Sequence, residues 1–107
     1  MSARDVIAQL RDLAARTSDA YGAQRVAWGP VWQDARAWFD AELAKDGLSA
    51  TMDAAGNRWV TLPGASSRTV IVGGHLDSVP NGGWLDGPLG TLAGLDAVRR
   101  FVRAGQT

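Results

Sequence analysis

The chain has 107 residues, of which 46% are hydrophobic and 21% are charged, and its eleven basic and eleven acidic side chains cancel. This length suits one domain or part of one, and the composition is that of a soluble globular protein rather than a disordered or membrane segment. The balanced charge gives no reason to expect nucleic acid or a membrane as a partner. Because there is no cysteine and the N-terminus lacks the apolar run of a signal peptide, we expect a cytoplasmic protein without disulfides or thiolate metal sites.

Two helices are predicted in the N-terminal half. Ser2 and Asp5 can cap a helix over about residues 3–20. A second helix is predicted from Pro30, a residue favoured in the first helical turn, to Gly47, which ends it. We expect both helices to pack on a sheet. Apolar residues recur at helical spacing in each, as Val6, Leu10, Leu13 and Ala14 in the first and as Trp32, Ala35, Phe39 and Leu43 in the second.

Strands are predicted in the middle of the chain. Residues 48–62 combine alternating apolar positions with a turn-forming run, which is typical of a β-hairpin. Residues 69–74 are apolar and β-branched, which predicts a central strand covered on both faces. Helical spacing returns over residues 92–102. Helices before and after the strands favour the α/β fold class.

The only histidine, His75, directly follows the predicted central strand, where ligand sites of open α/β sheets gather. His75 and Asp77 are two positions apart, so in extended geometry both side chains point the same way and could converge on one ion. Asp86 follows in a glycine-rich loop. Imidazole and carboxylate suit a divalent ion such as zinc, and a second carboxylate could bridge to another ion or hold the histidine tautomer.

The same residues also fit a purely structural interpretation. His75 could be a hydrogen-bonded polar residue at a strand end, Asp77 could form an Asx turn, and Asp86 with Gly87 could form an ordinary turn. The residue types and spacing alone leave both interpretations open.

A family resemblance favours the metal site. Residues 73–99, GGHLDSVPNGGWLDGPLGTLAGLDAVR, resemble the metal-binding signature of hydantoinase/carbamoylase-type amidases, which are relatives of allantoate amidohydrolase and of aminoacylase-like two-zinc metallopeptidases. The Arg36-Ala-Trp-Phe and Asp53-Ala-Ala-Gly-Asn motifs are similar to the family's helix and hairpin, so the resemblance covers most of the chain. The short interval between Asp77 and Asp86 favours the amidase branch.

The resemblance implies that residues 1–107 are the N-terminal portion of a three-layer α/β/α zinc-hydrolase catalytic domain. It implies that His75 binds one metal ion, that Asp86 bridges two, and that Asp77 orients His75. The complete enzyme is then expected to be a homodimer that holds two divalent ions, zinc or else manganese, cobalt or nickel. Its expected substrates are small linear amides such as N-carbamoyl amino acids or ureido compounds, hydrolysed by metal-activated water.

The resemblance places the rest of the machinery further toward the C-terminus. In the family a glutamate activates the water, whereas Glu42, the only glutamate here, precedes the site in a predicted helix. Because two side chains rarely hold zinc tightly, we expect the 107 residues alone to be inactive. Two other hypotheses stay open. The chain could be a non-catalytic or partner-complemented α/β module, or a stand-alone α/β domain whose glycine-rich loop binds a small ligand without metal.

Overall fold

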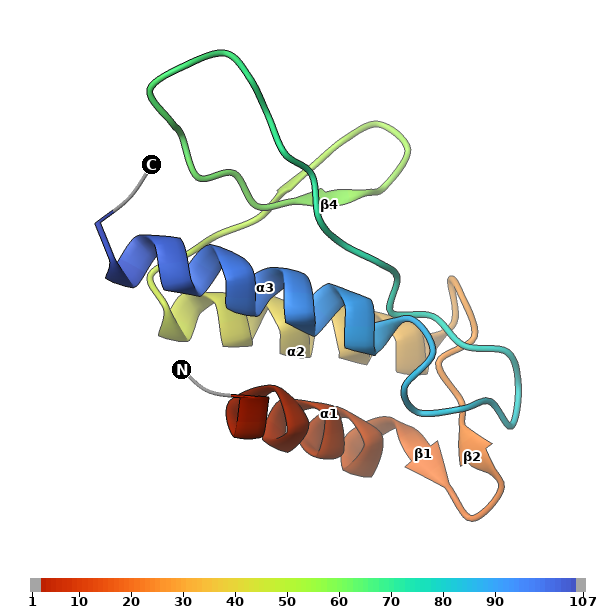
Figure 1. Cartoon of the computed structure of the whole chain (residues 1–107). Coiled ribbons are helices and arrows are strands. Elements are labelled where there is room, and N and C mark those ends of the chain that lie inside the picture. Colours follow the sequence, from red (N-terminus) through yellow and green to blue (C-terminus); the bar gives the residue numbers. More distant parts are fainter. Residues whose placement is uncertain (1–2, 106–107) are drawn as a thin grey trace.

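The computed structural model describes residues 3–105 and contains three helices in that range, shown in Figure 1. They are α1 (Ala3–Thr17), α2 (Pro30–Lys45) and α3 (Pro88–Arg103). The first helix therefore ends at Thr17 rather than near residue 20, and Ser2, its predicted cap, lies outside the described residues. Among the described residues no helix is long and apolar enough to cross a membrane.

Two short antiparallel hairpins complete the secondary structure of the described residues. β1 (Ser18–Asp19) pairs with β2 (Gly22–Ala23), and β3 (Thr51–Met52) pairs with β4 (Arg58–Trp59). The second hairpin confirms the prediction for residues 48–62, although its strands are only two residues long. The first hairpin was not predicted. Helices and strands together confirm the α/β class.

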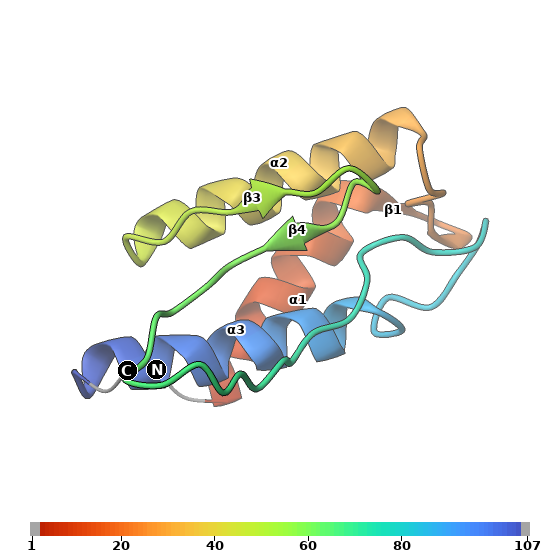
Figure 2. The same ribbon diagram turned by 90° about the horizontal axis from the view of Figure 1, so that it is seen from above.

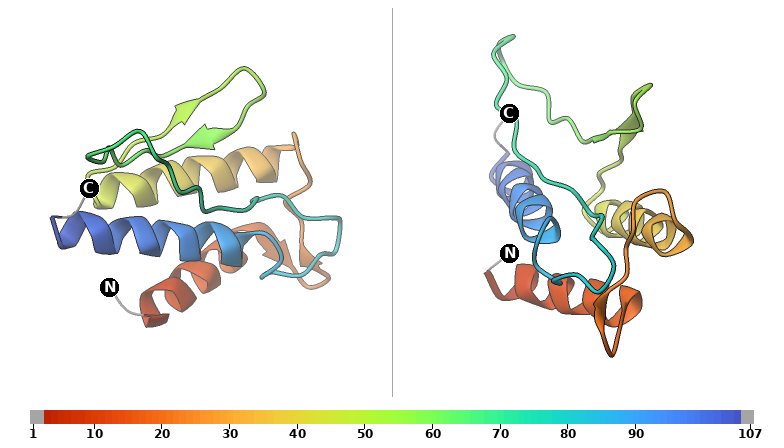
Figure 3. Two further views of the ribbon diagram at one scale, coloured as in Figure 1. Left: turned by 45° about the horizontal axis from the view of Figure 1, so that its top comes forward. Right: turned by 90° about the vertical axis from the view of Figure 1, so that its right-hand side faces the viewer.

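The elements are arranged in layers. Helices α2 and α3 lie side by side, α1 lies under them, and the β3–β4 hairpin with the extended chain after it lies over them (Figures 1, 2 and 3). The two predicted helices therefore do not both pack on a sheet, because α1 packs on α2 and α3 instead.

One hydrophobic core joins the three helices. It contains the predicted apolar residues of the first two helices, except that Ala14 is only half-buried and Trp32 is buried outside this core. Each large side chain in it contributes roughly 1.5–3 kcal/mol to folding. The core consists of Val6, Leu10 and Leu13 of α1, Ala35, Trp38, Phe39 and Leu43 of α2, and Leu92 and Leu95 of α3, with Leu48, Ala50, Val60 and Leu76 packed against it.

The predicted central strand at residues 69–74 is wrong. These residues run extended, but no strand among the described residues pairs with them. Val70 is 90% exposed and Ile71 is 69% exposed, so the segment is not covered on both faces. Only one side lies on α3, where a Cβ at Gly94 would come within 3.3 Å of Val72 Cγ2. A strand needs hydrogen-bonded neighbours, which an apolar run cannot supply by itself.

The turn between β3 and β4 carries a testable pH response. The Asp53 carboxylate accepts hydrogen bonds from the Trp59 indole (2.8 Å), from the Asn57 side chain and backbone, and from the Ala55 backbone. These donors, with the indole first, lower the pKa of Asp53 from its ordinary 3.8 to about 2.

Because the folded pKa is depressed, the stabilisation is complete above about pH 4 and is lost as the pH falls through about 2. We expect the Trp59 indole N–H resonance in an NMR titration to move with that low midpoint, and Asp53→Asn to abolish the transition. A midpoint near the ordinary value would contradict the hydrogen-bonded turn.

Candidate metal centre

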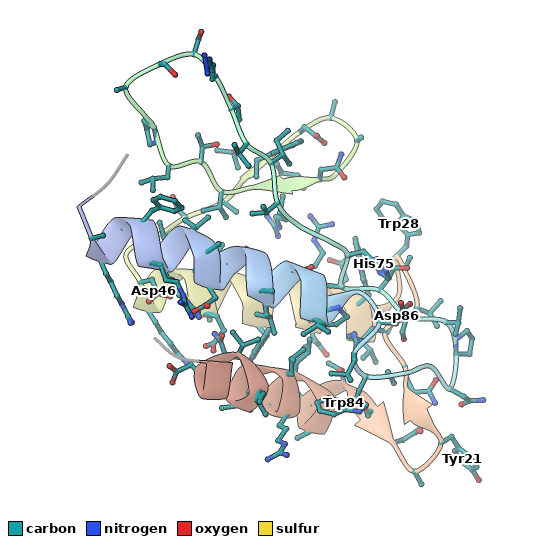
Figure 4. All side chains as sticks on the ribbon, viewed as in Figure 1. Tyr21, Trp28, Asp46, His75, Trp84 and Asp86 are labelled. Atoms are coloured by element: carbon teal, nitrogen blue, oxygen red, sulfur yellow. The ribbon has the colours of Figure 1, made fainter. Side chains whose placement is uncertain are left out.

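The loop with the three predicted site residues lies where α3 begins. Figure 4 shows His75 and Asp86 at that end of the molecule. Between His75 and Asp77, Leu76 turns inward and packs against the core, whereas the His75 and Asp77 side chains are 51% and 42% exposed. The partly buried Leu76 therefore anchors a loop in which the His75 and Asp77 side chains are partly exposed.

The His75 ring is held through one of its two nitrogens. Nδ1 lies 3.1 Å from Asp77 Oδ1 and 3.0 Å from the Asp77 carbonyl oxygen. Both oxygens accept hydrogen bonds, so Nδ1 is the donor and carries the proton. The lone pair of the neutral ring is then on Nε2, which is the arrangement of a metal-binding histidine oriented by a carboxylate.

Gly87, the residue after Asp86, lies directly against His75. Its φ is +96°, and a Cβ there would lie 2.6 Å from His75 Cε1, Nδ1 and the carbonyl oxygen. Only glycine tolerates both the conformation and the approach. The Thr91 hydroxyl of α3 also donates to the His75 carbonyl at 3.2 Å. The loop thus brings the chain next to Asp86 against His75.

The donor types fit a divalent ion, but they are few. An imidazole nitrogen and a carboxylate oxygen are suitable ligands for zinc and similar ions. Within residues 3–105 no group of three or more histidine, aspartate or glutamate side chains could hold a metal ion. Glu42, buried in α2, accepts from Gln9 Nε2 and pairs with Lys45. Its carboxylate is therefore used in packing the helices.

Arg25 is a residue of the site that sequence analysis missed. It is fully buried, and its Nε donates to the Leu76 carbonyl at 2.6 Å. Burial lowers the pKa of the Arg25 guanidinium and the nearby Asp77 carboxylate raises it, with burial the larger effect. An arginine still keeps its charge. A lone arginine outside any apolar stripe gives no sequence signal for burial, so pattern analysis could not have found it.

The backbone around Arg25 also pairs with the loop. Ser78 N donates to the Arg25 carbonyl at 2.8 Å, and Arg25 N donates to Ser78 Oγ at 3.0 Å. Four residues further along the loop, Ala23 and Gly82 exchange two backbone hydrogen bonds in an antiparallel bridge. The end of β2 and the chain after it therefore fix the path of the loop from residue 76 to residue 82.

Comparison with curated proteins finds amidohydrolases. The chain is 37% identical to an allantoate amidohydrolase of Escherichia coli over 76 residues, which are 69% of this chain and 18% of that protein. It is 41% identical to an N-carbamoyl-L-amino-acid amidohydrolase of Rhizobium meliloti over 74 residues, 67% of this chain and 18% of that protein. No family model matches. The chain thus spans about a fifth of the length of these relatives.

Comparison with solved structures agrees. A hydantoinase/carbamoylase family amidase from Burkholderia ambifaria superimposes with a TM-score of 0.88 and 31% identity, over 98% of this chain and 27% of that one. An amidase of the same family from Burkholderia phymatum gives 0.81 and 30% identity, over 96% of this chain and 25% of that one. The chain therefore resembles the matched part of these amidases in both fold and sequence. The chain is a homologue of the hydantoinase/carbamoylase family of amidases over about a quarter of their length.

Proposed function

We propose that this chain forms the first part of the catalytic domain of a metal-dependent amidohydrolase, in which His75 and Asp86 bind metal and Asp77 orients His75. The bound ions would supply an activated water and polarise the scissile carbonyl. The substrates would be linear amides of the N-carbamoyl amino acid or ureido type. The complete enzyme would be a cytoplasmic homodimer with two divalent ions, zinc or else manganese, cobalt or nickel.

One observation carries this proposal. His75 Nδ1–H donates a hydrogen bond to Asp77, which leaves the Nε2 lone pair for an ion, while Gly87 holds the chain next to Asp86 against the same ring. The names of the relatives, allantoate and N-carbamoyl-L-amino-acid amidohydrolases, supply the substrate class.

Metal binding is the first test. We expect the chain to bind Zn²⁺ weakly in calorimetric titration and His75→Ala to abolish that binding, because His75 is the only imidazole. Asp77→Ala should weaken it about 10- to 100-fold by removing the carboxylate that accepts from His75 Nδ1. Asp34→Ala, at an exposed position on α2, is the control and should bind as the wild type does. Equal binding by His75→Ala would refute the assignment.

Complementation tests the reaction. We expect the chain alone to be inactive, since the described residues supply too few ligands for a tight site. The Rhizobium meliloti relative, expressed without the region that this chain matches, would supply the rest. Release of ammonia from an N-carbamoyl amino acid by the mixture, and its loss with His75→Ala, would support the enzyme. Hydrolysis by the chain alone would contradict its expected inactivity.

The small number of ligands also favours a second candidate, a non-catalytic module that retains the first half of the fold and associates with a partner. In the same complementation experiment this module would bind the remainder and Zn²⁺ without producing hydrolysis.

A further inference from the structure

We propose that Arg25 is a positioning residue. It sets the orientation of His75 by fixing the peptide that joins Leu76 to Asp77. This inference rests on the proposed metal role of His75 and names the residue behind that orientation. The hydrogen bonds of the Arg25 side chain go to Leu76 and Thr17 and not to His75 itself.

The Arg25 guanidinium lies between helix α1 and the His75 loop. Arg25 Nε donates to the Leu76 carbonyl at 2.6 Å, and Nη1 donates to Thr17 Oγ1 at 3.1 Å. Thr17 in turn donates to the Leu13 carbonyl in α1 at 2.7 Å. The guanidinium therefore connects the last turn of α1 to the loop of the proposed metal centre. A chain of hydrogen bonds between buried groups transmits position with little freedom.

The Leu76 carbonyl controls the position of Asp77. It belongs to the peptide plane that leads into Asp77, so its direction sets where Asp77 begins. Both oxygens that accept from His75 Nδ1 are those of Asp77. A rotation of this peptide would therefore move both acceptors and release the ring. Among the described residues, the donor that bonds to this carbonyl is Arg25 Nε.

Burying the Arg25 cation costs folding free energy. Arg25 is 0% exposed, and its Nη2 is buried without a hydrogen-bond partner among the described residues. Such a group is a poor way to stabilise a fold, because an apolar side chain of the same volume often does as well or better. We therefore attribute the burial of this cation, with its one unsatisfied nitrogen, to the geometry that it imposes on the loop.

The backbone makes this role separable from folding. The Arg25 main chain bonds to Ser78 independently of its side chain. Arg25→Met keeps these bonds and most of the buried volume while removing every side-chain donor. Arg25→Lys keeps the charge, but its single nitrogen cannot occupy the positions of both Nε and Nη1, so it should restore the orientation only in part.

The chain offers a matched control. Arg36 of α2 is also buried, donates through Nη2 to a backbone carbonyl, that of Gly56, at 2.7 Å, and stacks on Trp32. The Gly56 carbonyl lies in the β3–β4 turn rather than in the His75 loop. Arg36→Met therefore removes an equivalent buried arginine without touching the proposed metal centre.

The experiment reads the tautomer of His75 without metal. In alkaline buffer the imidazole is neutral, and long-range ¹H–¹⁵N NMR distinguishes a proton on Nδ1 from one on Nε2; the single histidine makes the assignment unambiguous. We expect the Nδ1–H form to dominate in the wild type and in Arg36→Met. Arg25→Met should give a mixture with the Nε2–H form, and Arg25→Lys should lie between. Circular dichroism confirms that each variant folds, and if Arg25→Met does not fold, Arg25→Lys decides.

Zn²⁺ titration of the same variants completes the test. Arg25→Met should bind about 10- to 100-fold more weakly than the wild type, as is usual when a group that orients a ligand is lost. A folded Arg25 variant with the wild-type tautomer would overturn the inference and leave the proposed function intact. If the wild type binds no Zn²⁺, the proposed function fails, while the tautomer still decides whether Arg25 positions His75.

Discussion

Gly87→Ala is expected to destabilise the chain by about 1–3 kcal/mol through its left-handed backbone alone, and to displace His75 in addition. The added Cβ would lie 2.6 Å from two ring atoms and the carbonyl oxygen of His75, which is closer than real Cβ atoms approach. The ring must therefore move, and the hydrogen bond to Asp77 is lost with it. Urea denaturation measures the first effect, and the His75 NMR spectrum with Zn²⁺ titration measures the second.

Two other glycines separate the two causes. Gly47 has a φ of +69° but open space around its Cβ position, so Gly47→Ala reports the backbone cost without a clash. Gly83 lies in the same loop with open space and no positive φ, so Gly83→Ala should behave as the wild type does. We expect only Gly87→Ala to weaken Zn²⁺ binding. Equal binding by all three variants would show that Gly87 does not set the position of His75.

The candidate site could be predicted from the sequence where local geometry decides. The spacing of His75 and Asp77 predicted that their side chains would lie on the same side, and their atoms are 3.1 Å apart. A turn at Asp86 and Gly87 was one interpretation of these residues, and Gly87 has a positive φ. The roles of His75, Asp77 and Asp86 at a metal ion stay predictions. Arg25 could not be foreseen, because its partners are 8 to 53 residues away.

The fold shows the same division between local and distant causes. Proline in the first turn and glycine after the last turn marked α2 almost to the residue, since these preferences act within one turn. Residues 69–74 have the composition of a buried strand but lack a paired neighbour among the described residues. Pairing depends on residues distant in sequence, so a strand-like composition predicts an extended chain and does not guarantee a sheet.

Asp46→Ala is expected to lose about 3–5 kcal/mol of folding free energy, because it breaks an ion pair with the buried Arg99. Arg99 of α3 is 2% exposed in its side chain, and its Nε donates to Asp46, which follows α2. Its Nη1 donates to Gln9 of α1 at 2.9 Å, and Gln9 donates to Glu42. One charged group thus joins all three helices, and urea denaturation would measure the loss.

A double variant tests whether the ion pair itself stabilises the fold or whether Asp46 is needed only to compensate the buried charge of Arg99. Arg99→Met with Asp46→Leu replaces the pair by apolar side chains and should recover most of the stability lost in Asp46→Ala. Arg16→Ala, which breaks an exposed pair with Asp12 on α1, should change stability by less than about 1 kcal/mol and serves as the control. If the double variant is as unstable as Asp46→Ala, the network itself holds α3 in place. The orientation of α3, whose first turn carries Thr91 against His75, would then depend on a charge at its opposite end.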